Sequence, residues 1–301
     1  MKILIAPSTF GEFSDQPFRL LKENGFDIIQ NPYGRKLTQS ELFSLLEGVS
    51  GVIAGLEEYD EHILSKTKLR IISRCGSGLS NIDIQLAEKF GINVYNTPNG
   101  PTQSVAELTV GCLITLVRDI HRLNDLMHKN KWEKATGRLI KNMNILLIGY
   151  GRIGKKVASI LENIGANIFV YDPFLSDNII PENYNRVQLS EGLKVADVIS
   201  LHSSGEDLIL GDAEFKIMKR DVFILNVARG GLIDENALEK NLQSGKIKGA
   251  WLDTFNNEPY NGSLSVYKQV ILTPHIGSYT VEGRKVMEYE SVENLLKGFD
   301  N

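Results

Sequence analysis

The chain has 301 residues, of which 42% are hydrophobic and 23% are charged, and its formal net charge at pH 7 is −4. This composition is that of an ordinary globular protein, and the length favours two domains. The weak negative charge argues against a nucleic-acid partner, because such partners require a basic surface. No apolar run approaches the about 18 residues that cross a bilayer, so we expect no membrane segment.

The two cysteines, Cys75 and Cys112, lie within apolar segments. This position predicts buried free thiols, which are typical of proteins in a reducing compartment. The N-terminal sequence MKILIAPSTF reads as a β-strand and lacks the apolar core and cleavage site of a signal peptide. We therefore expect a cytoplasmic protein without a disulfide framework. His62, His121 and His128 lie on helical segments without partners at metal-ligand spacing, so we expect no metal site.

Residues 1–97 alternate between short apolar runs and helical patterns. The apolar runs predict strands at residues 2–6, 27–30, 52–54, 69–73 and 94–95. The helical patterns between them cover residues 17–24, 38–46, 61–65 and 82–90. Strands joined by crossover helices form a parallel sheet that is covered by helices on both faces.

Residues 96–101, Asn-Thr-Pro-Asn-Gly-Pro, interrupt this alternation and predict a hinge. Ser104 and Glu107 then have the spacing of a capping box, which predicts that a long helix begins at Ser104. The apolar stripe of this helix consists of Val105, Leu108, Cys112, Leu116, Val117, Ile120 and Leu123. A stripe of this length needs covering on more than one side, so it packs in the core or forms a subunit interface.

Residues 144–172 contain the most specific pattern in the chain. An apolar run is followed by Gly149, Gly151 and Gly154, then by a helical pattern, a second apolar run and Asp172. The three glycines allow a tight turn, the close approach of a pyrophosphate and close packing of helix on strand. The helix N-terminus attracts phosphate, and Asp172, 18 residues after Gly154, is placed to accept hydrogen bonds from an adenosine ribose. The pattern predicts a dinucleotide site; the alternative is a tight turn that binds nothing.

The same region favours NAD over NADP as the cofactor. Pro173 and Phe174 follow Asp172, so no arginine or lysine stands there to pair with a 2′-phosphate. The Asp172 carboxylate would itself repel that phosphate. We therefore expect NAD.

The rest of the chain predicts a second half of the same sheet. Apolar runs predict strands at residues 196–201, 222–226, 247–252 and 271–272, with a helix at 236–243. The final helix, at about residues 280–297, follows the last strand, and we expect it to return to the first domain. In open sheets of this kind, ligands bind beyond the carboxyl ends of the strands.

Polar residues at these strand ends include a set suited to chemistry on a 2-oxo or 2-hydroxy acid. Arg229 supplies a cation for the carboxylate and carbonyl, His275 an acid/base, and Glu258 a carboxylate that orients the base. Each has a plainer interpretation: a surface ion pair for Arg229, a turn histidine for His275, and loop shaping for Glu258. Their shared position at strand ends favours the catalytic interpretation.

Two further strand-end features are candidate binding elements. His202 follows the strand at 196–201, and it either lines the adenine or pyrophosphate side of the dinucleotide site or only closes the strand. Ser77 lies between Gly76 and Gly78, without the surrounding motif of a serine nucleophile. Backbone N–H groups in such a turn suit the capture of an anion.

Several long segments resemble one family. The resemblance to the D-isomer-specific 2-hydroxyacid dehydrogenases, which include phosphoglycerate dehydrogenase, is carried by GYGRIG, NVARGGLIDENAL, GKIKGAWLDTFNNEP and ILTPHIGSYT. The family's substrate-side turn and hinge resemble CGSGLSNIDI and NTPNGPTQSVAELTVGCLITLVR. The resemblance runs from about Leu69 to the C-terminus. It implies two doubly wound parallel-sheet α/β domains: a Rossmann NAD-binding domain at 99–279, inserted in a flavodoxin-like substrate-binding domain at 1–98 and 280–301.

The resemblance also implies an activity, a partner and a role for each matching residue. The implied activity is NAD-dependent interconversion of a small D-2-hydroxy acid and its 2-oxo acid, in a homodimer formed through the NAD-binding domain. Arg229 would bind the substrate carboxylate and carbonyl oxygen, His275 would be the general acid/base, and Glu258 would be bonded to His275. The other implied contacts are backbone N–H groups of Arg152 and Ile153 for the pyrophosphate, Asp172 for the ribose, Val227 and Asp253 for the nicotinamide, and Ser77 and Gly78 for the substrate carboxylate.

The chain departs from the family's pattern in three places. After His202 it reads Ser-Ser-Gly-Glu-Asp, where the family commonly has a Pro-Leu-Thr type sequence, so the local cofactor loop differs. Glu57 and Glu58 stand near where phosphoglycerate dehydrogenases tend to offer an arginine, and they weigh mildly against phosphoglycerate, while Arg74 remains an available cation for a phosphorylated substrate. Trp251 replaces a residue that is often small, and we expect it to tighten strand packing.

Two other functions are open on the same fold. One is a non-enzymatic NAD(H) sensor or scaffold, as among transcriptional corepressor relatives, although Arg229, Glu258 and His275 are all present. The other is formate dehydrogenase, but formate enzymes place a glutamine where Glu258 stands. Turnover of NADH with a panel of small 2-oxo acids distinguishes these functions.

Overall fold

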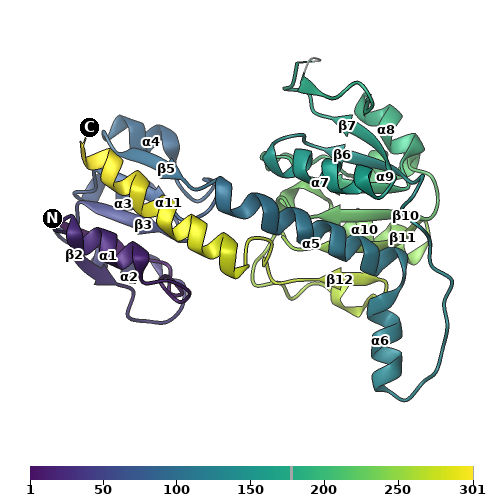
Figure 1. The fold of residues 1–301 in the computed structure, drawn as a ribbon, viewed down its shortest axis with the longest axis horizontal. Helices are drawn as coiled ribbons and strands as arrows, with labels where there is room; N and C mark the ends of the chain where they lie inside the picture. The colour runs from purple at the N-terminus through teal and green to yellow at the C-terminus, as the bar shows by residue number, and fades with distance from the viewer. Residues whose placement is uncertain (177–178, 301) are drawn as a thin grey trace. The chain divides into compact units, whose positions relative to one another are not determined.

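The computed structural model describes residues 1–176 and 179–300 (Figure 1). The chain divides into two compact units, Met1–Ser104 with Ser278–Asn301, called unit 1, and Val105–Gly277, called unit 2. Asn301, the last residue of the predicted substrate-binding domain, lies outside the described residues. Each unit has its own sheet and its own core.

Unit 1 is built on a parallel sheet with the order β2-β1-β3-β4-β5 among the described residues. Its strands are β1 (Lys2–Ile5), β2 (Asp27–Gln30), β3 (Gly51–Ala54), β4 (Ile71–Arg74) and β5 (Asn93–Asn96). This order is the flavodoxin-like one, in which the chain reverses direction across the sheet between β1 and β3.

Helices cover both faces of this sheet because successive strand residues point to opposite sides. In β1, Ile3 and Ile5 join one buried cluster, and Leu4 joins another. The helices are α1 (Gln16–Glu23), α2 (Gln39–Leu45), α3 (Glu61–Lys66), α4 (Ile84–Lys89) and α11 (Val281–Asp300). Thr38 and Glu41 form a capping box at the start of α2, as Thr38 accepts from the Glu41 N–H and the Glu41 carboxylate from the Thr38 N–H.

The final helix α11 returns to unit 1, as predicted, and packs against α1 and strands β3, β4 and β5 (Figure 1). Its buried face carries an ion pair between Arg284 and Glu288, whose side chains are 7% and 0% exposed and 2.8 Å apart. Glu288 also accepts the Gly11 N–H at 3.0 Å, and Arg284 donates to the Thr9 hydroxyl at 3.1 Å. The pair therefore ties the C-terminal helix to the loop after β1.

Replacing Arg284 by methionine is expected to lower the free energy of unfolding by about 3–5 kcal/mol, because Glu288 is left buried without its cation. Burial raises the pKa of Glu288, so this carboxylate takes up a proton more readily in the folded state. The loss in the variant should therefore shrink as the pH is lowered towards 5. Urea unfolding at pH 7 and pH 5 measures both effects.

Two controls separate this pair from a general effect of removing a charge. The double variant Arg284→Met/Glu288→Leu should regain much of the lost stability, because an apolar pair of similar volume replaces the buried charges. Arg19→Met breaks an exposed i,i+4 pair with Asp15, whose side chains are 70% and 67% exposed, and should have far less effect. A double variant as unstable as Arg284→Met would contradict this interpretation of the pair.

Unit 2 contains the larger parallel sheet, with the order β12-β11-β10-β9-β6-β7-β8 among the described residues. Its strands are β6 (Asn144–Ile148), β7 (Asn167–Tyr171), β8 (Asn185–Arg186), β9 (Val198–Leu201), β10 (Val222–Asn226), β11 (Ile247–Leu252) and β12 (Val270–Leu272). Numbered from β6, this is the Rossmann order with one added edge strand. The predicted fold class, two doubly wound parallel sheets, is confirmed.

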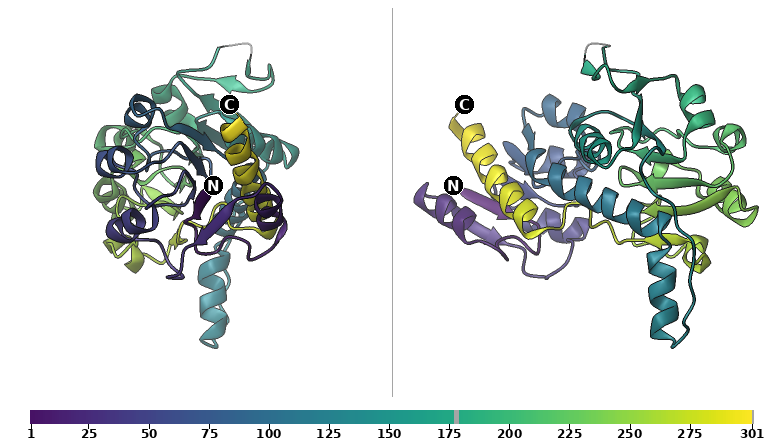
Figure 2. Two further views of the ribbon diagram at one scale, coloured as in Figure 1. Left: turned by 90° about the vertical axis from the view of Figure 1, so that its left-hand side faces the viewer. Right: turned by 45° about the vertical axis from the view of Figure 1, so that its right-hand side comes forward.

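Alternating strand residues again divide the core of unit 2 into two layers. Leu146 and Ile148 of β6 face one cluster, while Ile145 and Leu147 face the other together with Trp251. The helices that begin in or belong to this unit are α6 (Ile120–His128), α7 (Arg152–Asn163), α8 (Leu189–Val195), α9 (Asp212–Ile217) and α10 (Glu235–Gln243), with 3-10 turns η2 (Gly230–Leu232) and η3 (Ser263–Val266). Figure 2 shows α6 extending away from the rest of its unit.

The predicted helix start at Ser104 is wrong. Helix α5 runs from Asn99 to Val117, so Ser104 lies inside it, and its hydroxyl is 2.7 Å from that of Thr280. Asn99, Gly100 and Pro101 form the first turn, where a proline costs little because its missing N–H has no helical partner. Residues 99–101 of the predicted hinge are therefore helical, and the hinge itself stays a prediction.

The predicted stripe through Leu123 also does not lie on one helix. Helix α5 ends at Val117. Asp119 then has a left-handed φ of 55°, and a separate helix, α6, begins at Ile120. Strand β8 and helices α8 and α9 were not predicted, since each is at most seven residues long and weakly patterned. None of the helices in the described part of the chain is both long and apolar enough to cross a membrane.

Candidate active site

The glycine turn after β6 has the geometry that the sequence predicts for a phosphate-binding turn. Gly149 has a φ of +95°, and a Cβ there would lie 2.6 Å from the Ser203 nitrogen. A Cβ on Gly154 would lie 2.3 Å from the Gly149 carbonyl oxygen, so helix α7 packs directly on the turn. A Cβ on Gly151 would meet no atom within 4 Å, which leaves open space where a phosphate would approach.

Helix α7 begins directly after Gly151, which has no side chain to cap it. The first N–H groups of a helix have no partner within the helix. Those of Arg152 and Ile153 are thus placed at the turn with the positive end of a twelve-residue helix behind them. The predicted pyrophosphate contacts are compatible with this arrangement.

Asp172 directly follows β7 and lies beside the glycine turn. Its Oδ2 accepts the Tyr150 N–H at 2.8 Å, and its Oδ1 accepts the Phe174 N–H at 3.0 Å. These bonds hold the carboxylate in one orientation, while each oxygen keeps a further lone pair. A ribose diol could therefore bind without displacing either bond.

His202 lies against the same turn, directly after β9. The backbone N–H of His202 donates to the Ile148 carbonyl at 2.7 Å, and the ring Nε2 is 2.8 Å from the Ser200 hydroxyl. Burial lowers the pKa of His202 to about 4, so the ring is neutral near pH 7. The His202 Nδ1 and the Ser203 hydroxyl are buried and have no hydrogen-bond partner among the described residues. Such orphaned atoms beside a glycine turn fit a polar ligand.

Arg229 is placed by a turn that the Asn226 side chain holds at the end of β10. The buried Asn226 amide donates to the Arg229 carbonyl at 2.8 Å and accepts the Ala228 N–H at 3.1 Å. The Arg229 guanidinium donates to the Ala228 carbonyl at 2.6 Å and is half-buried. Val227, between Asn226 and Ala228, is also half-buried. A Cβ on Gly230 would lie 2.0 Å from the Phe255 backbone, so the turn packs against the loop that leads to Glu258.

Glu258 and His275 form the predicted pair. The His275 Nδ1 is 3.0 Å from the Glu258 Oε2, and the side chains of His275 and Glu258 are 42% and 36% exposed respectively. The other oxygen of Glu258 accepts the Phe255 N–H at 3.1 Å. Because Nδ1 faces the carboxylate, Nε2 is the ring nitrogen left for another partner.

Electrostatics link Glu258, His275 and Arg229. Burial raises the pKa of Glu258, but the hydrogen bond and charge of His275, the Phe255 N–H and the charge of Arg229 together lower it overall. Glu258 is therefore an anion at neutral pH. The carboxylate can accept a hydrogen bond from the His275 Nδ1, 3.0 Å away.

Asp253 is buried at the end of β11 and holds the loop that carries His275. Its Oδ1 accepts the Thr273 hydroxyl at 2.5 Å and the Ile276 N–H at 2.9 Å, and its Oδ2 accepts the Gly277 N–H at 2.8 Å. Burial raises the pKa of Asp253, although these hydrogen bonds oppose the shift. These bonds occupy much of the carboxylate's accepting capacity, and its role towards the nicotinamide stays a prediction.

Ser77 and Gly78 belong to unit 1, where they follow β4. Gly76 has a φ of +150°, and its N–H donates to the Thr97 hydroxyl at 2.7 Å. The Ser77 carbonyl accepts the Asn96 side-chain amide at 2.7 Å, and Ser77 itself is exposed. A Cβ on Gly76 would lie 2.4 Å from a guanidinium nitrogen of Arg74, so that cation lies over the turn. An anion at this turn would meet backbone N–H groups and a positive charge.

Some structural supports of the site were not found from the sequence. Asn226 and Thr273 precede the residues that they position, and Trp251 donates its indole N–H to the Thr273 hydroxyl at 2.9 Å. Asn226 gave one usable signal, an amide that ends an otherwise apolar strand immediately before a turn. The bond between Trp251 and Thr273 joins two neighbouring strands and has no local signal.

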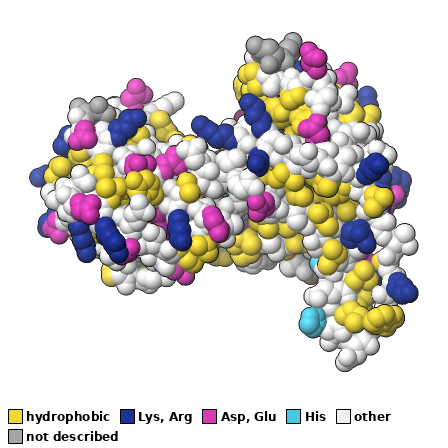
Figure 3. All heavy atoms as spheres, viewed as in Figure 1, with side chains coloured by type: hydrophobic (Ala, Val, Ile, Leu, Met, Phe, Trp, Pro, Cys, Tyr) yellow, Lys and Arg dark blue, Asp and Glu magenta, His cyan; other side chains and the backbone are white. Residues whose placement is uncertain are grey.

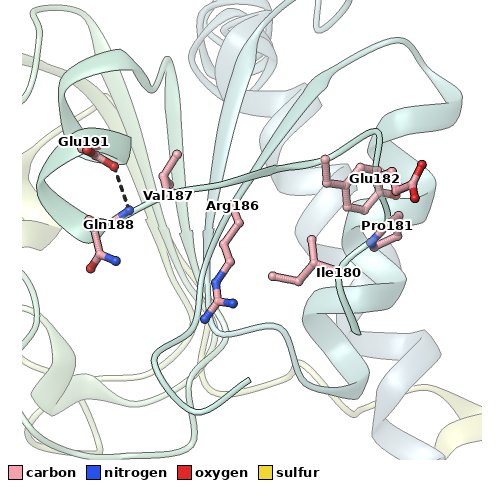
Figure 4. Close-up of a pocket in the computed structure, with 8 residues that line it drawn as sticks. Ile180, Pro181, Glu182, Arg186, Val187, Gln188 and Glu191 are labelled. Carbon is pink, nitrogen blue, oxygen red and sulfur yellow. Dashed lines mark hydrogen bonds between the residues drawn. The ribbon is translucent and has the colours of Figure 1, made fainter. Parts of the chain in front are cut away.

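A hollow of about 630 Å³ lies elsewhere in unit 2, at the edge of the sheet formed by β8 (Figure 4). It is lined by Ile180, Pro181, Glu182, Tyr184, Arg186, Val187, Gln188 and Glu191. None of the residues predicted for the active site lines it. Within the described ranges, no three His, Cys, Asp or Glu side chains come together as a metal site.

Comparison with known proteins agrees with this geometry. Residues 110–277 match the family model of the D-isomer specific 2-hydroxyacid dehydrogenase NAD binding domain. The chain is 33% identical over 275 residues to D-3-phosphoglycerate dehydrogenase of Pongo abelii, covering 88% of this chain and 51% of that protein. It is 39% identical over 238 residues to hydroxypyruvate reductase of Thermotoga maritima, covering 76% and 77%.

The fold has close relatives among solved structures. The TT0316 protein from Thermus thermophilus superposes with a TM-score of 0.90 at 28% identity, covering 100% of this chain and 97% of that one. The chain spans about half the length of the phosphoglycerate dehydrogenases that it matches. From the matched NAD-binding domain and these similarities, we conclude that the chain belongs to the D-isomer specific 2-hydroxyacid dehydrogenase family.

Proposed function

We propose that the protein is an NAD-dependent oxidoreductase that interconverts a small D-2-hydroxy acid and its 2-oxo acid. The observation that carries the proposal is the Glu258–His275 pair at 3.0 Å, with Arg229 close enough to affect the Glu258 carboxylate. This pair lies in the same unit as the glycine turn for a dinucleotide. A cofactor and an acid/base in one unit are what hydride transfer to a carbonyl requires.

NAD would be held by the residues of the glycine turn and its neighbours. The N–H groups of Arg152 and Ile153 would meet the pyrophosphate, and Asp172 the ribose diol. The orphaned Nδ1 of His202 supports a ligand at this place. Bound in this way, the nicotinamide supplies the hydride. The Asp172 carboxylate would repel a 2′-phosphate, so the proposal specifies NAD rather than NADP.

The side chains around the carbonyl would do the rest. Arg229 would pair with the substrate carboxylate and stabilise charge that develops on the carbonyl oxygen. His275 would donate a proton from Nε2 to that oxygen during reduction and remove it during oxidation. Glu258 would hold the ring in place through Nδ1 and stabilise its protonated form.

The substrate is proposed to be a small 2-oxo acid without a phosphate group. Ser77 and Gly78 would meet its carboxylate through backbone N–H groups, with the Arg74 guanidinium beside the turn. Glu57 is buried in the same unit and accepts the Gly55 N–H at 2.9 Å, while Glu58 is exposed. Two carboxylates after β3 would repel a phosphate at that end of the sheet.

A homodimer through unit 2 is part of the proposal. Apolar side chains remain exposed on α5, on α6 and in the segment that follows, and Trp132 is 79% exposed. The others are Ile114, Ile120, Met127 and Leu139. Figure 3 shows apolar side chains gathered over α5 and α6. A second copy covering them would remove this surface from water.

The buried free thiols of Cys75 and Cys112 support a cytoplasmic location.

Glu258→Gln is expected to move the pH profile of NADH-dependent reduction to lower pH, because the charges of Glu258 and His275 stabilise each other. Reduction needs protonated His275, so its rate falls as the pH rises, and removing the carboxylate charge brings this fall to lower pH. Initial rates between pH 5 and 9 measure the shift. Glu162→Gln, which alters a carboxylate bonded to Tyr184 at 2.8 Å, is the matched control and should leave the profile in place. An unchanged profile in Glu258→Gln would remove the proposed pairing from the mechanism.

The activity is tested with purified protein, a panel of 2-oxo acids and the consumption of NADH or NADPH in parallel. The panel contains glyoxylate, pyruvate, hydroxypyruvate, 2-oxoisocaproate and phosphohydroxypyruvate. We expect turnover of an unphosphorylated member, a D-configured product and a preference for NADH. Tight NADH binding without turnover of any member would instead indicate an NAD(H) sensor, and preferred turnover of phosphohydroxypyruvate would overturn the proposed substrate class.

A further inference from the structure

Trp251 lies at the centre of unit 2 and makes a polar contact that packing alone does not require. Its side chain is 0% exposed, it is the last residue but one of β11, and its Nε1 donates to the Thr273 hydroxyl at 2.9 Å. Strand β12 pairs with β11 so that Ile271 lies opposite Trp251, and the Thr273 N–H donates to the Leu252 carbonyl at 3.1 Å. Thr273 is therefore fixed by backbone pairing next to the indole.

The contact with Trp251 determines to which partner the Thr273 hydroxyl donates its proton and from which it accepts one. An indole N–H can only donate, so the hydroxyl oxygen must accept this bond. The single proton of the hydroxyl is then free to point at the Asp253 Oδ1, 2.5 Å away. We call this series of two hydrogen bonds the Trp251–Thr273–Asp253 chain. It ends on a carboxylate that is itself buried.

Asp253 connects the Thr273 hydroxyl to the loop that carries His275. Its two oxygens accept the N–H groups of Ile276 and Gly277, the two residues after His275. On the other side, the His275 N–H donates to the Thr273 carbonyl at 2.9 Å. His275 has a left-handed φ of 53°, a conformation that few residues with a Cβ adopt and that the hydrogen bonds around it favour. Asp253 and Thr273 accept those hydrogen bonds.

We propose that Trp251 and Thr273 are positioning residues that act through Asp253 to hold His275 in the orientation its chemistry requires. The inference rests on the proposed function, because it takes His275 as the acid/base. Trp251 and Thr273 touch neither substrate nor cofactor in this scheme. They fix the direction of one hydroxyl proton, which fixes the carboxylate that anchors the His275 loop.

The kinetic test compares Thr273→Val, which has nearly the same shape without the hydroxyl, with Thr273→Ser, which keeps it. Thr273→Val leaves the buried Asp253 and the indole N–H without their partner, and kcat should fall by roughly 5- to 150-fold. The KM for NADH should change less than kcat, because the glycine turn is untouched. Thr273→Ser should restore most of the lost kcat. Trp251→Phe removes the indole N–H together with the five-membered ring that carries it, and it should lower kcat by roughly 2- to 10-fold.

A control substitution accounts for the loss of a threonine hydroxyl as such. The Thr67 hydroxyl donates to the Ile63 carbonyl at 2.8 Å in unit 1, away from this chain of hydrogen bonds. Thr67→Val should therefore leave kcat unaltered. If Thr273→Val does not fold, Thr273→Ser and Trp251→Phe still test the proposal, which predicts a larger fall in kcat for Trp251→Phe.

A second readout does not depend on turnover. With ¹³C-labelled histidine, the imidazole signal of His275 is assigned by its absence in His275→Asn, and the other four histidines serve as internal references. In Thr273→Val and Trp251→Phe, the His275 signal should broaden or divide while the reference signals stay in place. If the wild-type protein turns over no 2-oxo acid, the proposed function fails, but the signal still reports on the loop. An unchanged His275 signal in both variants, or a kcat of Thr273→Val within twofold of the wild type, would overturn the positioning role.

Discussion

Replacing His275 by asparagine is expected to lower kcat for NADH-dependent reduction by about 10²- to 10⁴-fold, the usual contribution of a positioned acid/base. Asparagine is chosen over alanine because His275 has a left-handed φ of 53°, which asparagine tolerates well. The loop should then keep its shape while the proton donor is lost. Initial rates with saturating NADH and 2-oxo acid measure the effect.

NADH binding provides the discriminating control for His275→Asn. The residues proposed for the pyrophosphate and the ribose, Gly149 to Gly154 and Asp172, are separate from the His275 loop, so the dissociation constant should change little. Fluorescence quenching on titration with NADH measures it. His62→Asn alters an exposed histidine of α3 and should change neither kcat nor binding. A His275→Asn variant with near-normal kcat would remove His275 from the acid/base role.

Arg229→Ala is expected to reduce kcat/KM for the 2-oxo acid by on the order of 30- to 5,000-fold, the range for truncating one partner of a desolvated charge pair. The charge of the Arg229 guanidinium helps to lower the pKa of the Glu258 carboxyl. Its loss removes both the partner of the substrate carboxylate and a charge that stabilises the developing oxyanion. Both kcat and KM should therefore change.

Arg229→Lys tests whether geometry or charge matters more at this position. Lysine keeps the charge but loses the planar pair of donors that matches a carboxylate, so we expect only partial recovery of kcat/KM. Arg220→Ala, which removes an exposed guanidinium bonded to the Ser244 carbonyl at 3.3 Å, should have no effect. If Arg229→Ala and Arg220→Ala behaved alike, Arg229 would be a surface residue with no part in substrate binding.

The glycine turn was predictable from sequence because its requirements are local. At both Gly149 and Gly154, a Cβ would lie within 3 Å of a backbone atom, so no other residue fits without a shift. Asp172 directly follows the next strand, whose last residue, Tyr171, pairs with Ile148 of β6. In each case, residues within one βαβ unit determine the geometry, and the pattern in the sequence reflects it directly.

The start of α5 was mispredicted because two local signals compete. Ser104 and Glu107 have capping-box spacing, but Pro101 is equally suited to a first helical turn. The Ser104 hydroxyl instead meets that of Thr280, a residue 176 positions away. A contact over such a distance cannot be read from the residues around Ser104. It removes the hydroxyl from the capping role that the local pattern assigned to it.

The strand-end residues were predictable as a set, but not their supports. Parallel strands place their carboxyl ends on one edge, so Arg229, Glu258 and His275 could be expected near one another. The hydrogen bonds that the Thr273 hydroxyl makes with the Trp251 indole and the Asp253 carboxylate join β11 and the residue after it to the segment that follows β12. The sequence predicted only tighter packing for Trp251, because side-chain bonds between strands depend on a register that the sequence does not specify.

The most direct test of the proposed mechanism is a crystal structure of the protein with NADH and oxamate, an unreactive analogue of a 2-oxo acid. We predict that the Arg229 guanidinium pairs with the oxamate carboxylate and that the His275 Nε2 lies within hydrogen-bond distance of the oxygen equivalent to the reacting carbonyl. Glu258 should remain on Nδ1, as it is here at 3.0 Å. An analogue bound with its carbonyl oxygen turned away from His275, or held without Arg229, would contradict this mechanism.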